Sequence, residues 1–182
     1  IVDRFDIICK TAFENQIKIL VDAEESWFQG AIDDIVLNMM IKYNKQSTIV
    51  FNTSQMYRHD RLKYLNELKK LSIENSFHVG VKLVRGAYIE KENKRAKKHN
   101  YKSPICESKD ATDVNFNEGA KFILSNLDNF SLFCGPHNEK SIYDILDLMK
   151  EGKMQKNNPK IWFGQLYGMS DNISFNLAEE GY

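Results

Sequence analysis

Five short apolar runs recur along the chain and predict buried β-strands. Each is three to six residues long and rich in β-branched or aromatic side chains. The runs cover residues 19–21, 48–51, 79–84, 131–134 and 161–163. Because most of them lack polar alternation, we expect strands that are buried on both faces, as in a parallel sheet, and not a half-solvated antiparallel sheet.

Apolar residues recur at helical spacing between these runs. The stripes cover residues 5–13, 32–40, 62–71, 116–127 and 142–149, with charged residues opposite. Such stripes are typical of amphipathic helices that pack against a core. Alternating strands and helices are built from βα units, so the chain predicts an α/β fold, either an open doubly wound sheet or a (β/α)8 barrel. Its length suits a single domain over residues 1–182.

One step between strands is longer than the others because it contains an insertion at residues 89–110. Seven basic residues lie in it among glutamates: Lys91, Lys94, Arg95, Lys97, Lys98, Lys102 and Lys109. We interpret the insertion as containing a solvated helix face. A contact with a membrane surface or with phosphate is the alternative.

Charge and composition exclude several classes of protein. Lys plus Arg and Asp plus Glu number 25 each, so the formal net charge is zero and no global field attracts nucleic acid. No apolar run approaches the roughly 18 residues that a membrane-spanning helix needs. The three cysteines are odd in number and far apart. They fit a reducing compartment and argue against a disulfide scaffold.

Polar residues follow each of the five apolar runs. They form the sets 22–25, 52–55, 85–88, 135–138 and 164–168. If the strands are parallel, all five sets lie at the carboxyl ends of the strands, the face that carries the active site in barrels of this type. Glycines in three sets would let the backbone approach a ligand. We therefore expect this face to bind a ligand.

The chemistry of these sets favours a flat heterocyclic ligand. Amides and the cations Lys82 and Arg85 would suit a reduced flavin, whose negative charge a Lys or Arg stabilises. Lys82 could alternatively serve as a Schiff-base lysine. Only His137 among the histidines follows a strand, which is poor for a metal site. A metal-assisted hydrolase that uses Asp22, Glu24 and His137 nevertheless stays open as a different class of function.

Seven stretches, taken in order, resemble the proline dehydrogenase family. They are 21–24 (Val-Asp-Ala-Glu), 52–57 (Asn-Thr-Ser-Gln-Met-Tyr), 82–88 (Lys-Leu-Val-Arg-Gly-Ala-Tyr), 101–105, 112–113, 137–138 (His-Asn) and 163–171. The most specific are 82–88 and the segment that begins Gln165-Leu166-Tyr167-Gly168.

This resemblance implies a distorted (β/α)8 barrel of the TIM type that holds FAD. It implies oxidation of L-proline to Δ1-pyrroline-5-carboxylate, the first step of proline catabolism, by hydride transfer to flavin N5. A membrane quinone would accept the electrons. The implied location is cytoplasmic and peripheral at the inner membrane in a bacterium, or mitochondrial in a eukaryote.

The resemblance also assigns site residues. Asp22 on the substrate side and Lys82 would be catalytic, with no metal. The flavin would be lined by Gln55, Lys82, Val84, Arg85, Gly86, Ala87, Tyr88, His137, Asn138, Gln165 and Leu166. Several have structural alternatives. Asp22 could cap the following helix, Arg85 could form a salt bridge at the barrel end, and His137 could be a satisfied, partly buried histidine. Tyr88 and Tyr167 could serve in packing alone.

The sequence also departs from the family. Lys82 stands where many members carry Arg, and Gly135-Pro136 precede the His-Asn pair in place of small or hydroxyl residues. An early strand with a lysine, and a late helix whose arginines grip the proline carboxylate, have no match here. We therefore expect a central fragment of the catalytic domain, an incomplete barrel of about five parallel strands. We expect it to be inactive alone and able to self-associate through its open edges. A non-catalytic fragment without flavin is the further alternative.

Overall fold

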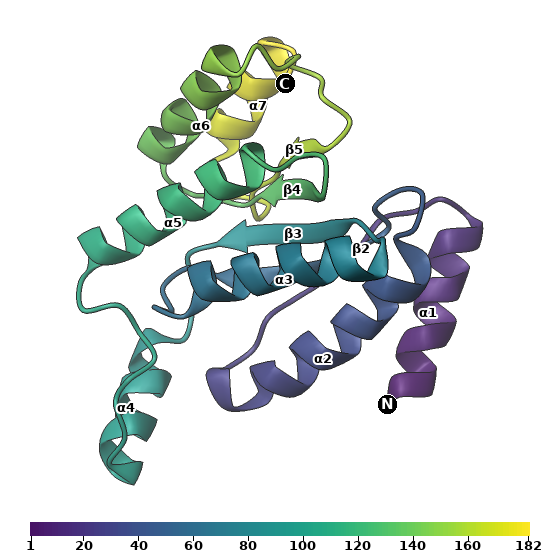
Figure 1. The fold of residues 1–182 in the computed structure, drawn as a ribbon. Helices are drawn as coiled ribbons and strands as arrows, with labels where there is room; N and C mark the ends of the chain where they lie inside the picture. The colour runs from purple at the N-terminus through teal and green to yellow at the C-terminus, as the bar shows by residue number, and fades with distance from the viewer.

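Strands and helices alternate along residues 1–182, which the computed structural model describes (Figure 1). The strands are β1 (Ile19–Val21), β2 (Val50–Gln55), β3 (Val79–Val84), β4 (Phe130–Cys134) and β5 (Ile161–Phe163). The helices are α1 (Val2–Glu14), α2 (Ser26–Tyr43), α3 (Arg61–Asn75), α4 (Ile89–His99), α5 (Lys109–Leu124), α6 (Glu139–Glu151) and α7 (Asp171–Glu179). This order confirms the predicted alternation, with two helices between β3 and β4.

The five strands form one parallel sheet in which spatial order follows chain order. A doubly wound sheet reverses its strand order at a switch point, whereas a barrel adds each strand beside the previous one. The observed order therefore decides between the two predicted architectures in favour of the barrel type.

The sheet is strongly curved. The rings of Phe51 on β2 and Trp162 on β5 meet edge to face, with centroids 5.7 Å apart. β3 and β4 lie between these strands, so a flat sheet would separate β2 and β5 by about 14 Å at the usual strand spacing. A hydrogen bond of 2.8 Å between the hydroxyls of Thr48 and Ser131 spans the same inner side. The strands thus form part of a barrel wall, with one face turned inward.

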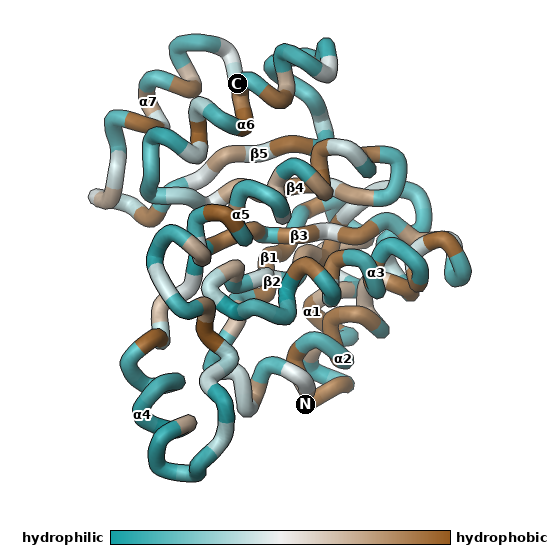
Figure 2. Tube along the Cα trace, turned by 60° about the vertical axis from the view of Figure 1, so that its left-hand side comes forward, coloured by the Kyte–Doolittle hydropathy of each residue, from teal (hydrophilic) through white to brown (hydrophobic).

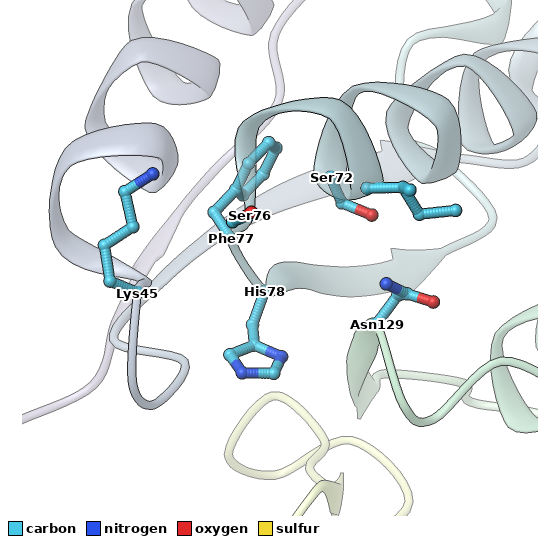
Figure 3. Close-up of a pocket in the computed structure, with 7 residues that line it drawn as sticks. Lys45, Ser72, Ser76, Phe77, His78 and Asn129 are labelled. Atoms are coloured by element: carbon cyan, nitrogen blue, oxygen red, sulfur yellow. The ribbon is translucent and has the colours of Figure 1, made fainter.

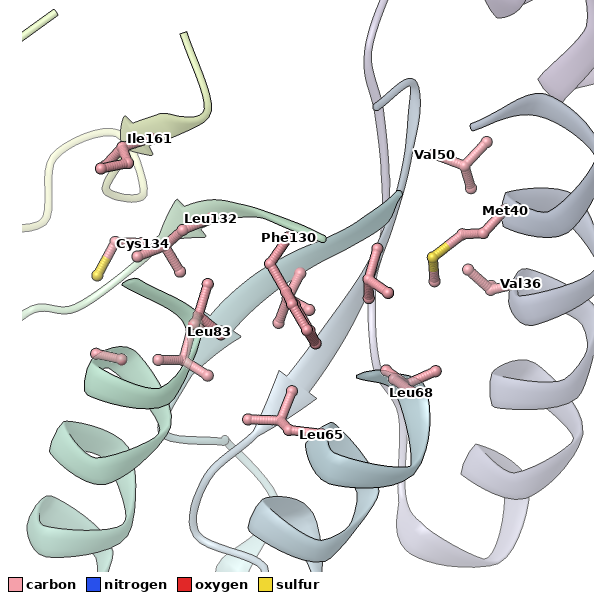
Figure 4. Packing of buried hydrophobic residues seen from close by; sticks show 14 of the residues in the cluster. Val36, Met40, Val50, Leu65, Leu68, Leu83, Phe130, Leu132, Cys134 and Ile161 are labelled. Carbon is pink, nitrogen blue, oxygen red and sulfur yellow. The ribbon is translucent and has the colours of Figure 1, made fainter. Parts of the chain in front are cut away.

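The main hydrophobic core lies between the outer face of this wall and the helices. It contains 25 buried residues. Figure 4 shows Met40 of α2 and Leu65 and Leu68 of α3 packed around side chains of the sheet such as Val50 and Phe130. A small second cluster joins α6 to α7 through Ile142, Ile173 and Leu177. The helices therefore cover the outer face of the wall.

Helix α4 differs from the other helices. It projects away from the sheet in Figure 1, and Figure 2 shows it as largely hydrophilic. Only Glu92 and Ala96 are buried, whereas Lys94, Lys97 and Lys98 are exposed. Its outer side is the solvated basic face that the sequence predicted. No helix in the chain is both long enough and apolar enough to cross a membrane.

The predicted second strand, 48–51, is wrong at both ends, because β2 spans Val50–Gln55. The four residues expected to follow the strand continue its hydrogen-bonded ladder with β3 and are all buried. Their polar groups find partners inside the fold: Asn52 donates to Asp33, and the Thr53 hydroxyl donates to a backbone carbonyl of β1. Polarity therefore did not mark the end of this strand.

Candidate functional site

Lys82 and Asp22 form an ion pair at the carboxyl ends of the strands. Lys82 lies on β3 and Asp22 directly follows β1, and the Lys82 Nζ is 2.5 Å from the Asp22 carboxylate. The Lys82 side chain is 21% exposed and that of Asp22 is 75% exposed. Glu25 occupies the N-cap position of α2, so the alternative that Asp22 caps this helix is wrong. The structure thus brings together the two residues predicted to be catalytic.

Gln55 and Val84 end β2 and β3 and are paired in register. Gln55 is 4% exposed, and its Oε1 is buried without a hydrogen-bond partner in the protein. An unsatisfied buried acceptor costs about 1–3 kcal/mol. Such an atom at a strand end is therefore typical of a position where a donor from a ligand completes the hydrogen bonding.

The turn after β3 presents small residues and backbone at the same face. Gly86 has a φ of +128°, and a Cβ at this position would lie 2.6 Å from the Tyr57 ring, so the turn requires glycine. Ala87 is exposed. The Tyr88 hydroxyl donates to the Glu24 carboxylate at 3.1 Å, and this hydrogen bond raises the pKa of the phenol.

Arg85 turns toward the helices. Its Nε donates to Asp113 at 2.6 Å, its Nη2 donates to Ser141 at 2.8 Å, and its guanidinium lies over the Phe116 ring. Burial raises the pKa of the Asp113 carboxyl, but hydrogen bonds from Lys109 and Arg85 outweigh burial and lower it. These contacts are the salt bridge considered as the structural alternative. The buried Arg85 Nη1 has no partner, so a contact with flavin stays a prediction.

The last two predicted sets follow β4 and β5. The Asn138 Oδ1 accepts a hydrogen bond from the amide of Ser141 and so caps α6. His137 is exposed, so its interpretation as a partly buried histidine is wrong. Gln165 donates to the Pro136 carbonyl at 3.4 Å and accepts from the Ser174 hydroxyl.

Two further side chains in the loop after Gln165 point into solvent. Leu166 is 63% exposed and Tyr167 is fully exposed. The alternative that Tyr167 serves only in packing is therefore wrong, because its ring is not packed against the protein.

The three residues proposed for a metal-assisted hydrolase do not converge. Asp22 pairs with Lys82, Glu24 accepts from Tyr88, and no three His, Cys, Asp or Glu side chains are placed to share an ion. The geometry of these donors therefore does not support that alternative.

A buried polar network behind the strand ends was missed by reasoning from the sequence. The Asp33 carboxylate on α2 accepts hydrogen bonds from Asn52 at 2.7 Å, from Gln29 at 2.8 Å and from Arg61 at 3.0 Å. Asn52 thus faces the helices and not the open face where it was expected. A signal existed, because Gln29 and Asp33 share the helical face of the buried Val36.

A separate hollow of about 340 Å³ lies at the opposite ends of the strands (Figure 3). It is lined by Lys45, Ser72, Ile73, Ser76, Phe77, His78 and Asn129. Phe77 and His78 precede β3, and Asn129 precedes β4. Burial, followed by the charge of Lys160, lowers the pKa of His78. Because barrel folds of this type carry their sites at the carboxyl ends, we assign the candidate site to the face with Lys82.

The curved parallel sheet defines an α/β protein of the barrel class, and the Lys82–Asp22 ion pair lies at the candidate site, at the carboxyl ends of its strands. The proline dehydrogenase family model matches residues 3–182. The chain belongs to this family, as the resemblance of its motifs indicated.

Known relatives and solved structures agree with this membership. The chain is 35% identical to proline dehydrogenase 1, mitochondrial, of Dictyostelium discoideum, covering 98% of this chain and 32% of that protein. The human protein of the same name is 33% identical over 100% of this chain and 31% of its own length. The chain thus spans about a third of the length of these relatives.

A solved structure shows the same fold. It is proline utilization A from Bdellovibrio bacteriovorus inactivated by N-propargylglycine, with a TM-score of 0.92 and 20% sequence identity. The match covers 100% of this chain and 19% of that one. The chain therefore has the architecture of one part of a much longer protein.

Proposed function

We propose that the protein containing this chain oxidises L-proline to Δ1-pyrroline-5-carboxylate with FAD, the first step of proline catabolism. The observation that carries the proposal is the Lys82–Asp22 pair at the strand ends of a chain in the proline dehydrogenase family. The candidate site offers a fixed cation next to a carboxylate that points into solvent.

The residues present fit a flavin in two respects. Gln55 supplies a buried acceptor without a partner, which suits an N–H of the ring. Gly86 and Ala87 follow β3 at the same face and have no bulky side chains, so their backbone could lie against a flat ligand. When bound, FAD would accept a hydride from the carbon beside the proline nitrogen.

Lys82 would stabilise charge on the flavin, and Asp22 would orient the substrate. The Lys82 side chain is 21% exposed, and its positive charge would stabilise negative charge that develops on an adjacent ring. Its pairing with Asp22 brings a carboxylate next to this charge. Asp22 is the more exposed partner and is therefore available to orient the substrate.

A spectrum with and without substrate tests the function. The purified full-length protein should show flavin bands near ~450 nm, and anaerobic L-proline should bleach them. Tetrahydrofuran-2-carboxylate, which has oxygen in place of the ring nitrogen, should compete with proline without bleaching. A protein that retains no flavin after reconstitution, or a flavin that proline does not reduce, would contradict the proposal.

We further infer a membrane quinone as electron acceptor, at the bacterial inner membrane or in mitochondria. Two relatives are named mitochondrial proline dehydrogenases. The exposed lysines of α4 would suit anionic headgroups. Proline-dependent reduction of a quinone analogue, faster with anionic than with neutral vesicles, is the expected result, and equal rates would argue against a membrane role for α4.

A further inference from the structure

Two connections that leave the sheet at β1 and β3 are joined side by side by four contacts. The pairs are Asp22–Lys82, Glu24–Tyr88, Glu25–Lys91 and Ser26–Glu92. Both segments, 22–26 and 82–92, contribute their residues in the same order along the chain. β2 lies between β1 and β3 in the sheet, so the two segments meet across its carboxyl end.

Glu92 is the one fully buried residue among these four pairs. It is 0% exposed. Its carboxylate accepts a hydrogen bond of 2.6 Å from the Ser26 amide and one of 2.7 Å from the Ser26 hydroxyl. Ser26 is the first residue of α2, whose amide has no partner within the helix. The carboxylate thus satisfies this amide at the positive end of the helix dipole.

The other contacts between the segments are weaker anchors. The Lys91–Glu25 pair joins a lysine side chain that is 65% exposed to its carboxylate at 2.9 Å, and exposed pairs contribute little. The hydrogen bond of Tyr88 to Glu24 is also exposed. Within segment 22–26, the amide of Glu24 donates to Gln29 on the helix that the segment enters. The hydrogen bonds of Glu92 are therefore the contacts between the two segments that involve a fully buried side chain.

We propose that Glu92 is a positioning residue for the candidate active site, because it holds segment 22–26 where Asp22 meets Lys82. This inference rests on the proposed function. Asp22 is four residues from Ser26 and three-quarters exposed, so its own surroundings do not fix it. A displacement of about 1 Å at a reacting site can cost on the order of 100-fold in rate.

Tyr57 lies beside the turn that carries Gly86, within reach of the charge of Glu92. Burial, followed by the negative charge of Glu92, raises the pKa of the Tyr57 phenol. The Tyr57 ring is fully buried and occupies the space beside Gly86. The Tyr57 ring is therefore packed against the turn itself, whereas Glu92 reaches segment 22–26 through its hydrogen bonds to Ser26.

The test compares Glu92→Ala and Glu92→Gln in the full-length protein. Each substitution is made in two backgrounds, one that keeps Asp22 and one that carries Asp22→Ala. Glu92→Ala should lower kcat/KM for proline about tenfold or more. Glu92→Gln should restore most of this loss, because its carbonyl can accept from the Ser26 amide and its NH2 can donate to the Ser26 hydroxyl. With Asp22→Ala, Glu92→Ala should cost less than about twofold, since no Asp22 is left to misplace. Glu74→Gln, which removes an exposed carboxylate on α3 that has no ion pair, is the control for a lost negative charge.

Equal losses in the two Asp22 backgrounds would overturn the proposal, because Glu92 would then act through general stability. No loss in Glu92→Ala would also overturn it. If Glu92→Ala does not fold, Ser26→Ala removes only the hydroxyl bond and should show a smaller loss with the same dependence on Asp22.

Hydrogen exchange separates this inference from the proposed function. Glu92→Ala should speed amide exchange in residues 22–26, and Glu92→Gln should not. Unchanged exchange overturns the positioning role whatever the protein oxidises. If residues 22–26 exchange faster in Glu92→Ala but the protein does not oxidise proline, the proposed function is wrong. The conclusion that Glu92 anchors residues 22–26 would still hold.

Discussion

Lys82 and Arg85 are three residues apart and face opposite sides of the sheet. Lys82 points to the inner face and meets Asp22, whereas Arg85 contacts Asp113 and Ser141 among the helices. We expect Lys82→Met to weaken flavin binding about 10- to 150-fold, the effect of losing a charged hydrogen bond. Arg85→Met should instead lower the free energy of unfolding by about 1.5–3 kcal/mol. Flavin titration and urea unfolding measure the two effects.

This pair of variants also tests the flavin contact predicted for Arg85. If Arg85→Met releases flavin while its unfolding is unchanged, the free Nη1 of Arg85 serves the cofactor, and the contact with Asp113 is secondary. If Lys82→Met retains flavin as tightly as the wild type, Lys82 is not in the cofactor shell.

Gly86 is expected to tolerate no side chain. In Gly86→Ala, the added Cβ would meet the buried Tyr57 ring in a backbone conformation that L-residues rarely adopt. We expect a loss of about 1–3 kcal/mol in the free energy of unfolding. Gly30→Ala is the matched control, because nothing lies within 4 Å of its Cβ and it sits within α2. That variant should gain about 0.5–1 kcal/mol. Equal effects in both would disprove the packing argument.

At the scale of single residues, the sequence predicted which residues lie at the candidate site better than it predicted which way their side chains point. The motif around Lys82 placed this residue and Asp22 together at one face, and the structure pairs them. The direction of Arg85 depends on which residues of β3 face inward, and this alternation is set by strand pairing. The sequence did not indicate a role for Glu92, because an acidic residue within a basic run is typical of a solvated helix face. In the structure, Glu92 is completely buried.

Asn44 joins three elements, because it ends α2 and binds the backbone around β2 and β3. Its amide donates to the carbonyls of Val50 and His78, at 2.8 and 2.9 Å. Its Oδ1 accepts from the amides of Ile49 and Val50. Asn44→Ala would leave these buried groups unpaired, so we expect a loss of about 3 kcal/mol in urea unfolding. Asn66→Ala on exposed α3 should change the free energy by less than about 0.5 kcal/mol, and similar losses in both would refute this role.

The start of α3 should carry an acid-sensitive part of the stability. Burial raises the pKa of Asp60, but the hydrogen bonds and charges of Arg61 and Arg58 outweigh burial and hold it at about 2. The ionised carboxylate therefore stabilises the fold above about pH 4, and this contribution disappears as the pH falls toward 2. The Asp60 side chain is 38% exposed, so solvent screening reduces the expected contribution to about 1 kcal/mol.

A comparison of variants isolates this contribution. Between about pH 5 and pH 2.5, the free energy of unfolding should fall by about 1 kcal/mol less in Asp60→Asn than in the wild type. Asp34→Asn removes an exposed carboxylate without an ion pair, so its free energy of unfolding should fall by as much as that of the wild type. A parallel fall in all three proteins would show that Asp60 contributes no acid-sensitive stability.

At the scale of elements, apolar patterns predicted order and type but not every boundary. The β-branched runs located all five strands, and the apolar stripes located α1, α2, α3, α5 and α6, because burial produced both patterns. No such stripe marked α4 or α7. The limits of β2 could not be found in this way. Asn52 and Thr53 are polar, yet partners from α2 and β1 let them stay in a buried strand. Those partners are distant in sequence, and only the tertiary fold brings them close.

At the scale of the whole molecule, the sheet has two edges. β1 and β5 each pair with one neighbour only, and unpaired edge groups are templates for further strand pairing. Leu20 on β1 and Phe133 on β4 face the inner side, where Leu20 is 37% exposed. We therefore predict that the 182-residue polypeptide, produced as such, self-associates. Sedimentation should give a mean mass that rises with concentration above 21.2 kDa.

A charge on the edge strand should oppose this association. Leu20→Lys places an ammonium on the inner side of β1, where a partner strand would have to bury it, so the mean mass at a given concentration should fall. Ile73→Lys is the matched control, because Ile73 is 60% exposed on α3, away from both edges, and should leave the association unchanged. A wild-type chain that stays monomeric at every concentration would contradict the prediction. If both lysine variants reduce the mass equally, apolar surface in general, and not the open edge, drives the association.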